Sequence, residues 1–253
     1  MTALAGHHAV VTGGGRGIGR AIATALSGAG ANVTVIGRAA APLKEMVSQG
    51  HAKSFQTADV TDAAALNVAF QRAETASGPI SILVANAGAA QSAPFHKTTP
   101  DDFRRMFEVN TLGVVHAAQA VLKGMIERKF GRIIAVASIA GLKAFPYVSA
   151  YVSAKHATVG LVRSLAAETA RTGVTVNALC PGYTDTDLVD ESLDKITKAT
   201  GRSREEALAA LLKDSPLGRL ITPEEVAAAA LFLCSPQAAA ITGTALPIAG
   251  GEI

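Results

Sequence analysis

Tryptophan is absent from this chain of 253 residues, and aromatic side chains make up only 4% of it. A core without large rings must be built from Ala, Val, Leu and Ile, and a hydrophobic content of 49% supplies enough of them. That content, with only 17% charged residues, argues against disorder. No Ser/Pro-rich tract, charge block or low-complexity segment marks a linker, so we expect one domain over residues 1–253.

Other absences exclude whole functional classes. The net charge is only +3 and no basic, aromatic-rich stripe is present, so nucleic-acid binding is not expected. No apolar run reaches membrane-spanning length and the N-terminus lacks a signal pattern, which predicts a cytoplasmic protein without membrane contact. Cys180 and Cys234 stand apart, without metal-ligand spacing, and the six His are dispersed, so we expect buried thiols and no metal site.

A glycine-rich loop near the N-terminus is the strongest signal that is present. It runs from Thr12 to Gly19, between an apolar β-like run and a helical pattern. Because position 18 is Ile18, the glycines at 13, 17 and 19 give T-G-x-x-x-G-x-G and not the common G-x-G-x-x-G. Glycines let the backbone approach a ligand closely, and a helix start attracts phosphate. The alternative, a plain surface turn, is disfavoured by the strand before the loop and the helix after it.

The rest of the chain alternates short β-branched runs with helical patterns. This predicts an α/β fold of the doubly wound type, with a parallel sheet covered by helices on both faces. Seven strands are expected, at residues 8–11, 31–36, 52–57, 80–85, 131–137, 174–179 and 245–248. Helices are expected near residues 18–29, 40–49, 62–77, 100–128, 150–171, 189–213 (in two pieces) and 223–234. Helix-start signals accompany three of them, at Thr99, Ser203 and Thr222.

Tyr151 and Lys155 lie four residues apart at the start of an expected helix, and therefore on one face of it. A phenol alone has a pKa of about 10, too high for easy proton exchange near neutral pH. A neighbouring ammonium favours the phenolate and should lower that pKa, which makes the pair a candidate acid–base unit. Taken alone the spacing is a weak signal, because Tyr and Lys four apart are common on solvated helices.

Three other segments point to the same place. Ser138 ends an apolar strand, Asn86 to Gly88 follow another, and the glycine-rich loop follows the first. In open parallel sheets, ligands bind outside the carboxyl ends of the strands. We therefore expect these segments and Tyr151 to meet at one edge of the sheet.

With these residues in view, the chain resembles the short-chain dehydrogenase/reductase family over essentially its whole length. Any one of the matching motifs is unspecific, but together they are highly specific. They are Thr12–Gly19, Asp59, Asn86, Ala87, Gly88, Asn110, Ser138, Tyr151, Lys155, Pro181 and Gly182. The resemblance implies a Rossmann fold and a nicotinamide-dependent oxidoreductase.

The resemblance also implies four catalytic residues. Tyr151 is expected to be the general acid, Lys155 to lower its pKa and hold the nicotinamide ribose, and Ser138 to bind the substrate oxygen. Asn110 is expected at a helix kink, where it holds a water that links Lys155 to solvent. The implied cofactor-binding residues are Gly13, Gly15, Arg16, Gly17, Ile18, Gly19, Arg38, Asp59, Val60, Asn86, Ala87, Gly88, Tyr151, Lys155, Pro181, Gly182, Thr184 and Thr186.

The second expected strand indicates which nicotinamide cofactor is used. An acid at its end would bind the ribose 2′-hydroxyl of NAD, but the strand ends at Arg38, where a guanidinium could grip a 2′-phosphate. Arg16 adds a second positive charge. We therefore favour NADP(H), and NAD(H) remains the alternative because Arg16 also occurs in NAD users.

The resemblance also limits the range of substrates to be expected. The segment from about 184 to 220 is expected to form a lid over it. D-3-hydroxybutyrate dehydrogenases bind the substrate carboxylate with three polar residues. The matching positions in this chain hold the apolar residues Ala90, Ala140 and Val148. The chain instead resembles family members that reduce 3-oxoacyl thioesters and polyketides, which predicts reduction of a 3-oxoacyl thioester or a related ketone. Candidates for lining the pocket are Gln91, His96, Lys143, Tyr147 and Tyr183.

Two other functions stay open. One is an NAD-linked dehydrogenase that oxidises a secondary alcohol or 3-hydroxy acid, and the other is a non-catalytic nucleotide-binding regulator. Apolar residues cover more than one face of the expected helices 100–128 and 150–171, which predicts an oligomer. The resemblance implies a homotetramer built on these two helices, with the last strand and the C-terminal tail at a second interface.

Overall fold

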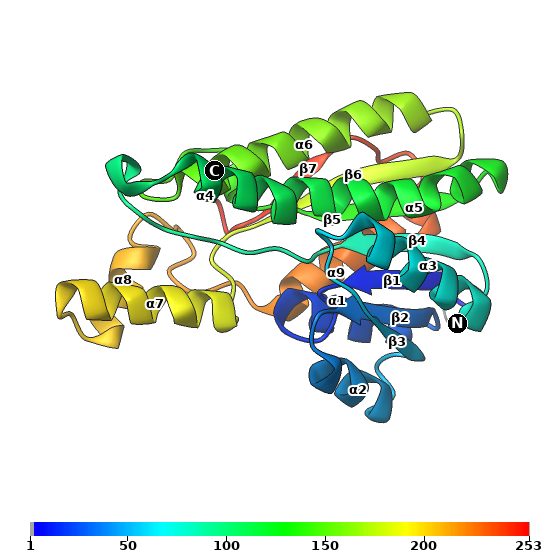
Figure 1. Cartoon of the computed structure of the whole chain (residues 1–253), viewed down its shortest axis with the longest axis horizontal. Coiled ribbons are helices and arrows are strands. Elements are labelled where there is room, and N and C mark those ends of the chain that lie inside the picture. Colours follow the sequence, from blue (N-terminus) through cyan, green and yellow to red (C-terminus); the bar gives the residue numbers. More distant parts are fainter. Residues whose placement is uncertain (1–2, 253) are drawn as a thin grey trace.

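A computed structural model of the chain describes residues 3–252 and shows a seven-stranded, all-parallel sheet with helices on both faces (Figure 1). The strand order is β3-β2-β1-β4-β5-β6-β7, the doubly wound arrangement expected from the sequence. The strands are β1 (His8–Thr12), β2 (Asn32–Gly37), β3 (Ser54–Thr57), β4 (Ile80–Ala85), β5 (Gly131–Val136), β6 (Val174–Pro181) and β7 (Ala245–Ile248).

Nine α-helices connect or follow these strands in the described residues. They are α1 (Gly17–Gly28), α2 (Ala40–Ser48), α3 (Ala63–Ser77), α4 (Pro100–Phe107), α5 (Gly113–Glu127), α6 (Ser149–Thr169), α7 (Asp187–Thr200), α8 (Arg204–Leu212) and α9 (Pro223–Cys234). The start signals are confirmed, since Thr99, Ser203 and Thr222 each form a capping box with the acid three residues later.

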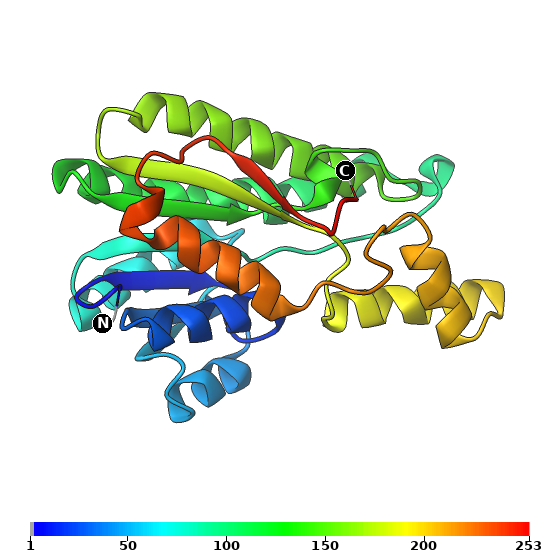
Figure 2. The same ribbon diagram turned by 180° about the vertical axis from the view of Figure 1, so that it is seen from behind.

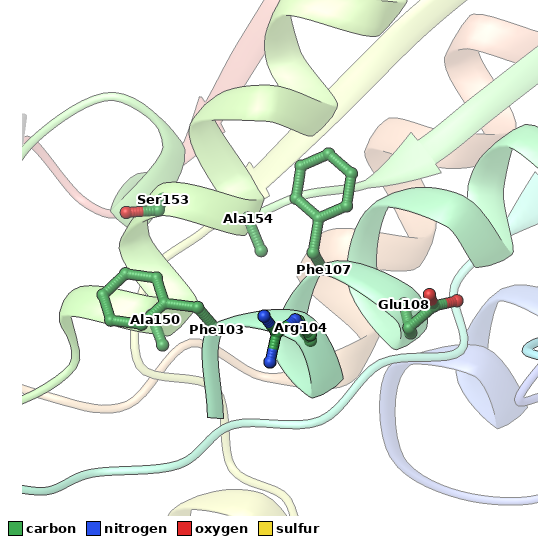
Figure 3. Close-up of a pocket in the computed structure, with 7 residues that line it drawn as sticks. All are labelled: Phe103, Arg104, Phe107, Glu108, Ala150, Ser153 and Ala154. Atoms are coloured by element: carbon green, nitrogen blue, oxygen red, sulfur yellow. The ribbon is translucent and has the colours of Figure 1, made fainter. Parts of the chain in front are cut away.

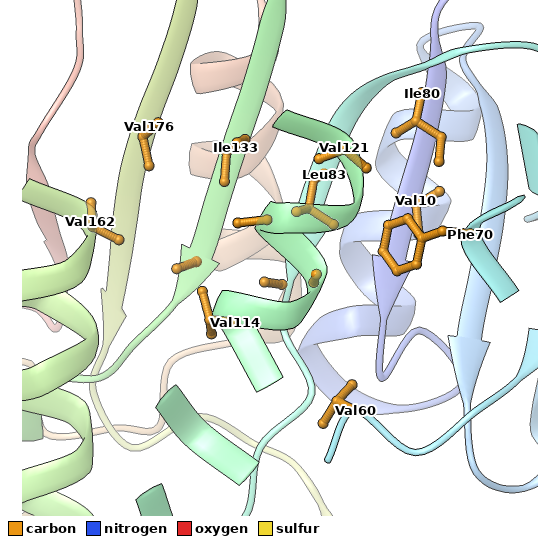
Figure 4. Packing of buried hydrophobic residues seen from close by; sticks show 14 of the residues in the cluster. Val10, Val60, Phe70, Ile80, Leu83, Val114, Val121, Ile133, Val162 and Val176 are labelled. Carbon is orange, nitrogen blue, oxygen red and sulfur yellow. The ribbon is translucent and has the colours of Figure 1, made fainter. Parts of the chain in front are cut away.

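The buried side chains form two apolar layers, because successive residues of a strand point to opposite faces of the sheet. In β1, Val10 faces a layer made with α3, α5 and α6, which Figure 4 shows in close-up. Ala9 and Val11 face the layer made with α1, α2 and α9, and Figure 2 shows α1 and α9 side by side on that face. The sheet therefore lies between two helical layers, as its near-continuous apolar strands predict.

The helix expected over residues 100–128 is interrupted at Asn110, where the resemblance implied a kink. Residues Glu108–Leu112 form a π-helical turn between α4 and α5, and Asn110 and Thr111 of that turn are buried. A π-turn inserts an extra residue into the helical ladder, so the apolar pattern continues through it and hides it. The expected helix over residues 189–213 is two helices, as predicted, and Gly201 ends the first with a φ of +71°.

Candidate active site

The carboxyl ends of β1 and β4 are joined by hydrogen bonds of Thr12 and Asn86. The Thr12 hydroxyl accepts from the backbone N–H groups of Asn86 (3.0 Å) and Ala87 (3.1 Å). The Asn86 amide donates to the carbonyl oxygens of Thr12 (2.9 Å) and Gly13 (3.2 Å). Asn86 thus fixes the glycine-rich loop to the central strands, and Ala87 lies beside it.

The glycine-rich loop has room for backbone only. A Cβ at Gly19 would lie 2.3 Å from the Gly13 carbonyl oxygen and 2.4 Å from Asn86 Nδ2. Gly13 and Gly17 have φ values of +66° and +50°, a region that side chains disfavour. The loop leads directly into α1, whose first N–H groups are free to bind an anion. This geometry fits a phosphate cradle.

Four further members of the predicted cofactor set, Gly15, Ile18, Val60 and Gly88, have close neighbours in the structure. A Cβ at Gly15 would lie 3.1 Å from Pro42 Cβ, and one at Gly88 would lie 2.8 Å from Asn110 Oδ1. Ile18 packs partly buried against the layer of α1 and α9. The carbonyl of Val60 lies 2.9 Å from His116 Nδ1.

Arg38 and Asp59 face each other beyond the ends of β2 and β3. Arg38 Nη1 lies 4.0 Å from Asp59 Oδ2, and 77% of the Arg38 side chain is exposed. Asp59 Oδ1 accepts from the backbone N–H (3.0 Å) and hydroxyl (2.9 Å) of Thr61. The Thr61 N–H and, to a smaller extent, the Arg38 charge lower the pKa of Asp59, so it stays ionised. A carboxylate and an exposed guanidinium thus stand together at this point of the edge.

Arg16 lies inside the glycine-rich loop, and its exposed side chain forms an ion pair. Its Nη1 lies 3.1 Å from Oδ2 of Asp187, the first residue of α7. Thr186 also touches the loop, since a Cβ at Gly17 would lie 3.1 Å from Thr186 Cγ2. The segment after β6 is therefore in contact with the predicted phosphate cradle.

That segment is fixed to the sheet by backbone and hydroxyl contacts. The N–H of Gly182, directly after Pro181, donates to Ile248 O (3.0 Å), and the hydroxyl of buried Thr184 donates to Gly182 O (3.0 Å). The Thr186 hydroxyl donates to Thr184 O (3.2 Å). Residues 181–186 thus form a rigid support at the carboxyl end of β6.

Lys155 is the buried cation of the site. It is 4% exposed, its Nζ donates to the Val136 carbonyl (2.9 Å), and it lies 5.6 Å from the centroid of the Tyr151 ring. Burial lowers the pKa of Lys155 to about 8. Lys155 and Tyr151 are therefore neighbours on α6, as their spacing predicts.

The expected lowering of the Tyr151 pKa by Lys155 is wrong for this structure. Burial raises the pKa of the Tyr151 phenol, and a hydrogen bond with the Ser138 side chain only partly opposes that rise. Burial is the largest effect because it removes water from the charged phenolate and so disfavours it. The spacing of the two residues in the sequence could not reveal this, since it carries no information on burial.

Ser138 follows β5 and starts a short 3₁₀ turn, Ile139–Gly141. Its hydroxyl oxygen accepts from the N–H of Ala140 (3.1 Å) and lies beside Tyr151, whose pKa it affects. The turn packs closely on α6, since a Cβ at Gly141 would lie 2.7 Å from Lys155 O. Ser138, Tyr151 and Lys155 are thus brought together at one edge, as predicted.

Asn110 occupies the π-turn and bonds to the loop after β4. Its amide oxygen accepts from the N–H of Ala89 (3.2 Å), and its amide nitrogen donates to Ala89 O (2.9 Å) and Met106 O (3.0 Å). The bond to Met106 O satisfies a carbonyl of the helix next to the irregular turn. The two bonds to Ala89 fix the loop that carries Gly88.

Two threonines that the sequence analysis did not select complete this network. The buried Thr158 hydroxyl lies 2.9 Å from the Asn110 carbonyl and 3.0 Å from the Ala154 carbonyl. The Thr111 hydroxyl donates to the same Ala154 carbonyl (2.9 Å). Thr158 stands three residues after Lys155, so a polar residue on the buried side of this helix was the signal that could have identified it.

The structure also bears on metal and membrane sites. Among residues 3–252, no three His, Cys, Asp or Glu residues are grouped so that they could hold a metal ion. Burial raises the pKa of Cys180 to about 11 and that of Cys234 to about 12, so both thiols stay protonated near neutral pH. In the same range, no helix combines the length and apolar content needed to cross a bilayer.

Known proteins similar to this chain fall in one family. Residues 7–197 match the family model described as short chain dehydrogenase. The chain is 38% identical to D-beta-hydroxybutyrate dehydrogenase of Cupriavidus necator, with 99% of each chain covered. It is 36% identical to acetoacetyl-CoA reductase of Shinella zoogloeoides, with 96% of this chain and 97% of the relative covered.

A comparison with solved structures leads to the same family. A variant of actinorhodin polyketide ketoreductase with NADPH superposes with a TM-score of 0.93 at 32% identity, covering 100% of this chain and 98% of that one. The match in sequence and in fold extends over all the segments that form the edge described above. The chain therefore belongs to the short-chain dehydrogenase/reductase family and is an oxidoreductase.

Proposed function

We propose that the protein reduces the ketone of a 3-oxoacyl thioester, or a related ketone, with NADPH. The observation that carries the proposal is the buried Lys155 ammonium beside Tyr151, with the Ser138 hydroxyl at the same phenol. This set offers a proton donor, a hydrogen-bond donor for the carbonyl oxygen and a cation that stabilises the phenolate left behind.

The residues at the edge of the sheet fit a dinucleotide. The cradle has no room for a Cβ at Gly13 or Gly19, and Gly17 has a φ of +50°; the cradle opens on the start of α1, which suits a pyrophosphate. Arg38 is the exposed cation where a 2′-phosphate would lie, and Asp59 is placed to accept from the adenine amino group. The other predicted contacts run from Val60 and Asn86–Gly88 to Pro181, Gly182, Thr184 and Thr186.

In this mechanism the nicotinamide, when bound, supplies the hydride to the carbonyl carbon. Tyr151 donates its phenolic proton to the carbonyl oxygen, and Ser138 donates a hydrogen bond to the same oxygen. Lys155 stabilises the phenolate by its charge. Asn110 holds the loop of Gly88 against this group through its bonds to Ala89.

Two relatives support the substrate and the cofactor. One is named acetoacetyl-CoA reductase, and the polyketide ketoreductase was solved with NADPH. A dehydrogenase acting on free hydroxybutyrate is less well supported, because Ala90, Ala140 and Val148 offer no charge to a carboxylate. Helices α7 and α8, which stand out from the sheet edge in Figure 1, would form the substrate lid.

A homotetramer is part of the proposal. A groove of about 350 Å³ between α4 and α6 is lined by Phe103, Phe107, Ala150 and Ala154, among others (Figure 3). Phe107 is 42% exposed there. None of the residues lining this groove belongs to the predicted site, so we assign the groove to contact with a second copy of the chain.

The test is consumption of NADPH with acetoacetyl-CoA and with longer 3-oxoacyl thioesters. Tyr151→Phe should lower kcat by roughly 10²–10⁴-fold and leave the affinity for NADPH within about threefold. A regulator without catalysis would bind NADPH but show no turnover in either protein. Absence of turnover with every thioester would overturn the proposal.

A further inference from the structure

A buried ion pair fixes the C-terminal tail next to the loop after Ser138. Glu252 is only 5% exposed, and its Oε1 lies 3.4 Å from Lys143 Nζ. The tail reaches this position through Gly250, where a Cβ would lie 2.5 Å from Leu217 Cβ. Leu217 belongs to the segment that follows α8, so the tail passes under the end of the predicted lid.

The pair lies close to the proposed catalytic residues, because Lys143 follows two residues after Gly141, where a Cβ would lie 2.7 Å from Lys155 O. Lys143 Nζ lies 5.2 Å from the centroid of the Phe145 ring, and Phe145 meets Tyr183 edge to face with centroids 6.2 Å apart. Burial raises the pKa of Tyr183, and the charges of Glu252 and Tyr151 raise it further. Glu252 and the proposed proton donor Tyr151 are therefore both near enough to Tyr183 to affect its pKa.

Charge balance in this region depends on the pair. A carboxylate as buried as Glu252 needs a cation beside it, and Lys143 is the partner that it has among the described residues. The Lys143 side chain is 31% exposed, and its charge is already compensated by Glu252. A substrate carboxylate that entered here would find no free cation and would meet the negative charge of Glu252.

We propose that the Lys143–Glu252 pair is a specificity determinant, which keeps this region electrically neutral and so selects neutral ketones over ketones with a free carboxylate. The inference rests on the proposed function, because it assigns the substrate class of that same site. The pair acts through charge and not through contact with the reacting atoms. Its effect is therefore on the choice between substrates of different charge.

The test compares ethyl acetoacetate with acetoacetate, which carry the same ketone and differ in charge. The wild type should have the higher kcat/KM for the neutral ester. Glu252→Gln keeps the shape of the side chain and leaves the Lys143 charge uncompensated. It should raise the ratio of kcat/KM for acetoacetate over ethyl acetoacetate by at least about tenfold.

Two variants control for structure. Lys143→Gln combined with Glu252→Gln is neutral again and should return the ratio to the wild-type value. Glu127→Gln removes the same charge from the exposed Lys123–Glu127 pair on α5 and should leave the ratio unchanged. If Glu252→Gln does not fold, Lys143→Gln alone should lower the ratio about tenfold, because it leaves the buried carboxylate uncompensated.

The outcomes separate this inference from the proposed function. An unchanged ratio in Glu252→Gln, or an equal rise in the neutral double variant, would overturn the inference while ketone reduction by the wild type stands. If the wild type reduces neither compound nor acetoacetyl-CoA, the proposed function fails and the inference fails with it.

Discussion

The ammonium of Lys155 is held 2.9 Å from the carbonyl oxygen of Val136, the last residue of β5. This bond links the Lys155 side chain of α6 to the end of β5, and so it fixes where the ammonium lies. The surrounding burial lowers its pKa to about 8, which makes the charge of Lys155 dependent on pH in a measurable range.

The first prediction concerns stability and pH. The unfolded chain should bind the Lys155 proton up to about pH 10.5, whereas the folded chain releases it near pH 8. Between these values the unfolded state binds more protons, so stability should rise with pH. Lys155→Met removes this contribution, which we put at about 3 kcal/mol in total.

Urea unfolding at pH 7 and pH 10 measures this contribution of Lys155 to the free energy of unfolding. The wild type should gain stability relative to Lys155→Met on going to pH 10, and the difference between the two proteins isolates Lys155 from Tyr151. Lys123→Met, at an exposed lysine, should behave as wild type. A pH dependence equal in wild type and Lys155→Met would contradict the assigned burial.

The second prediction concerns the cofactor. Arg38→Ala should raise KM for NADPH by roughly tenfold or more and change KM for NADH by less than about threefold, because only NADPH has a 2′-phosphate. Steady-state kinetics with both cofactors measures how KM for NADPH and KM for NADH each change. Arg20→Ala, which removes a cation paired with Glu45 on α2, serves as the matched control. A wild-type preference for NADH would refute the assignment of Arg38.

The third prediction concerns the network behind the site. Thr158→Val removes the hydroxyl that reaches the Asn110 carbonyl and leaves that buried oxygen with one partner fewer. We expect a loss of about 1–3 kcal/mol in the free energy of unfolding and a lower kcat, since the π-turn positions the loop of Gly88. Thr75→Val removes an exposed hydroxyl bonded to Gln71 O in α3 and should change neither quantity. A wild-type kcat in Thr158→Val would mean that the network stabilises only the fold.

The fourth prediction concerns assembly. Phe107→Glu places a charge in the groove between α4 and α6, where we propose that a second copy packs. Sedimentation should show a smaller particle than the wild type, because a buried unpaired carboxylate is costly. Val68→Glu, at an exposed apolar residue of α3, should leave the mass unchanged. Equal masses for wild type and Phe107→Glu would exclude this groove as the interface.

Much of the fold follows from sequence patterns because strand and helix periods are local properties. The seven strands and the separation of α7 from α8 were predicted, with ends that shift by one or two residues. The apolar pattern did not predict the π-turn at Glu108–Leu112, because it continues on both sides of the turn, and the kink expected at Asn110 came only from the family resemblance. Some candidate site residues were predicted because they follow strands, as Ser138 and Asn86 do, and others because of their spacing on a helix, as Tyr151 and Lys155 are; the rest came from the family resemblance.

What the sequence could not supply are the relations between distant segments. Thr111 and Thr158 stand 47 residues apart and meet only through the packing of α6 on the π-turn. Arg16 was selected for its charge, but its ion pair with Asp187 depends on the path that the chain takes after β6. The raised pKa of Tyr151 follows from burial, which no spacing encodes.

The strand order has a consequence for how the chain folds. β1 gains its first neighbour, β2, within its own N-terminal segment, but its second neighbour, β4, begins only at Ile80. During synthesis, the second edge of β1 therefore stays unpaired until α2, β3, α3 and finally β4 have emerged. Such long-range parallel pairing slows folding, and a nascent chain arrested before β4 should expose this edge to aggregation or to a chaperone.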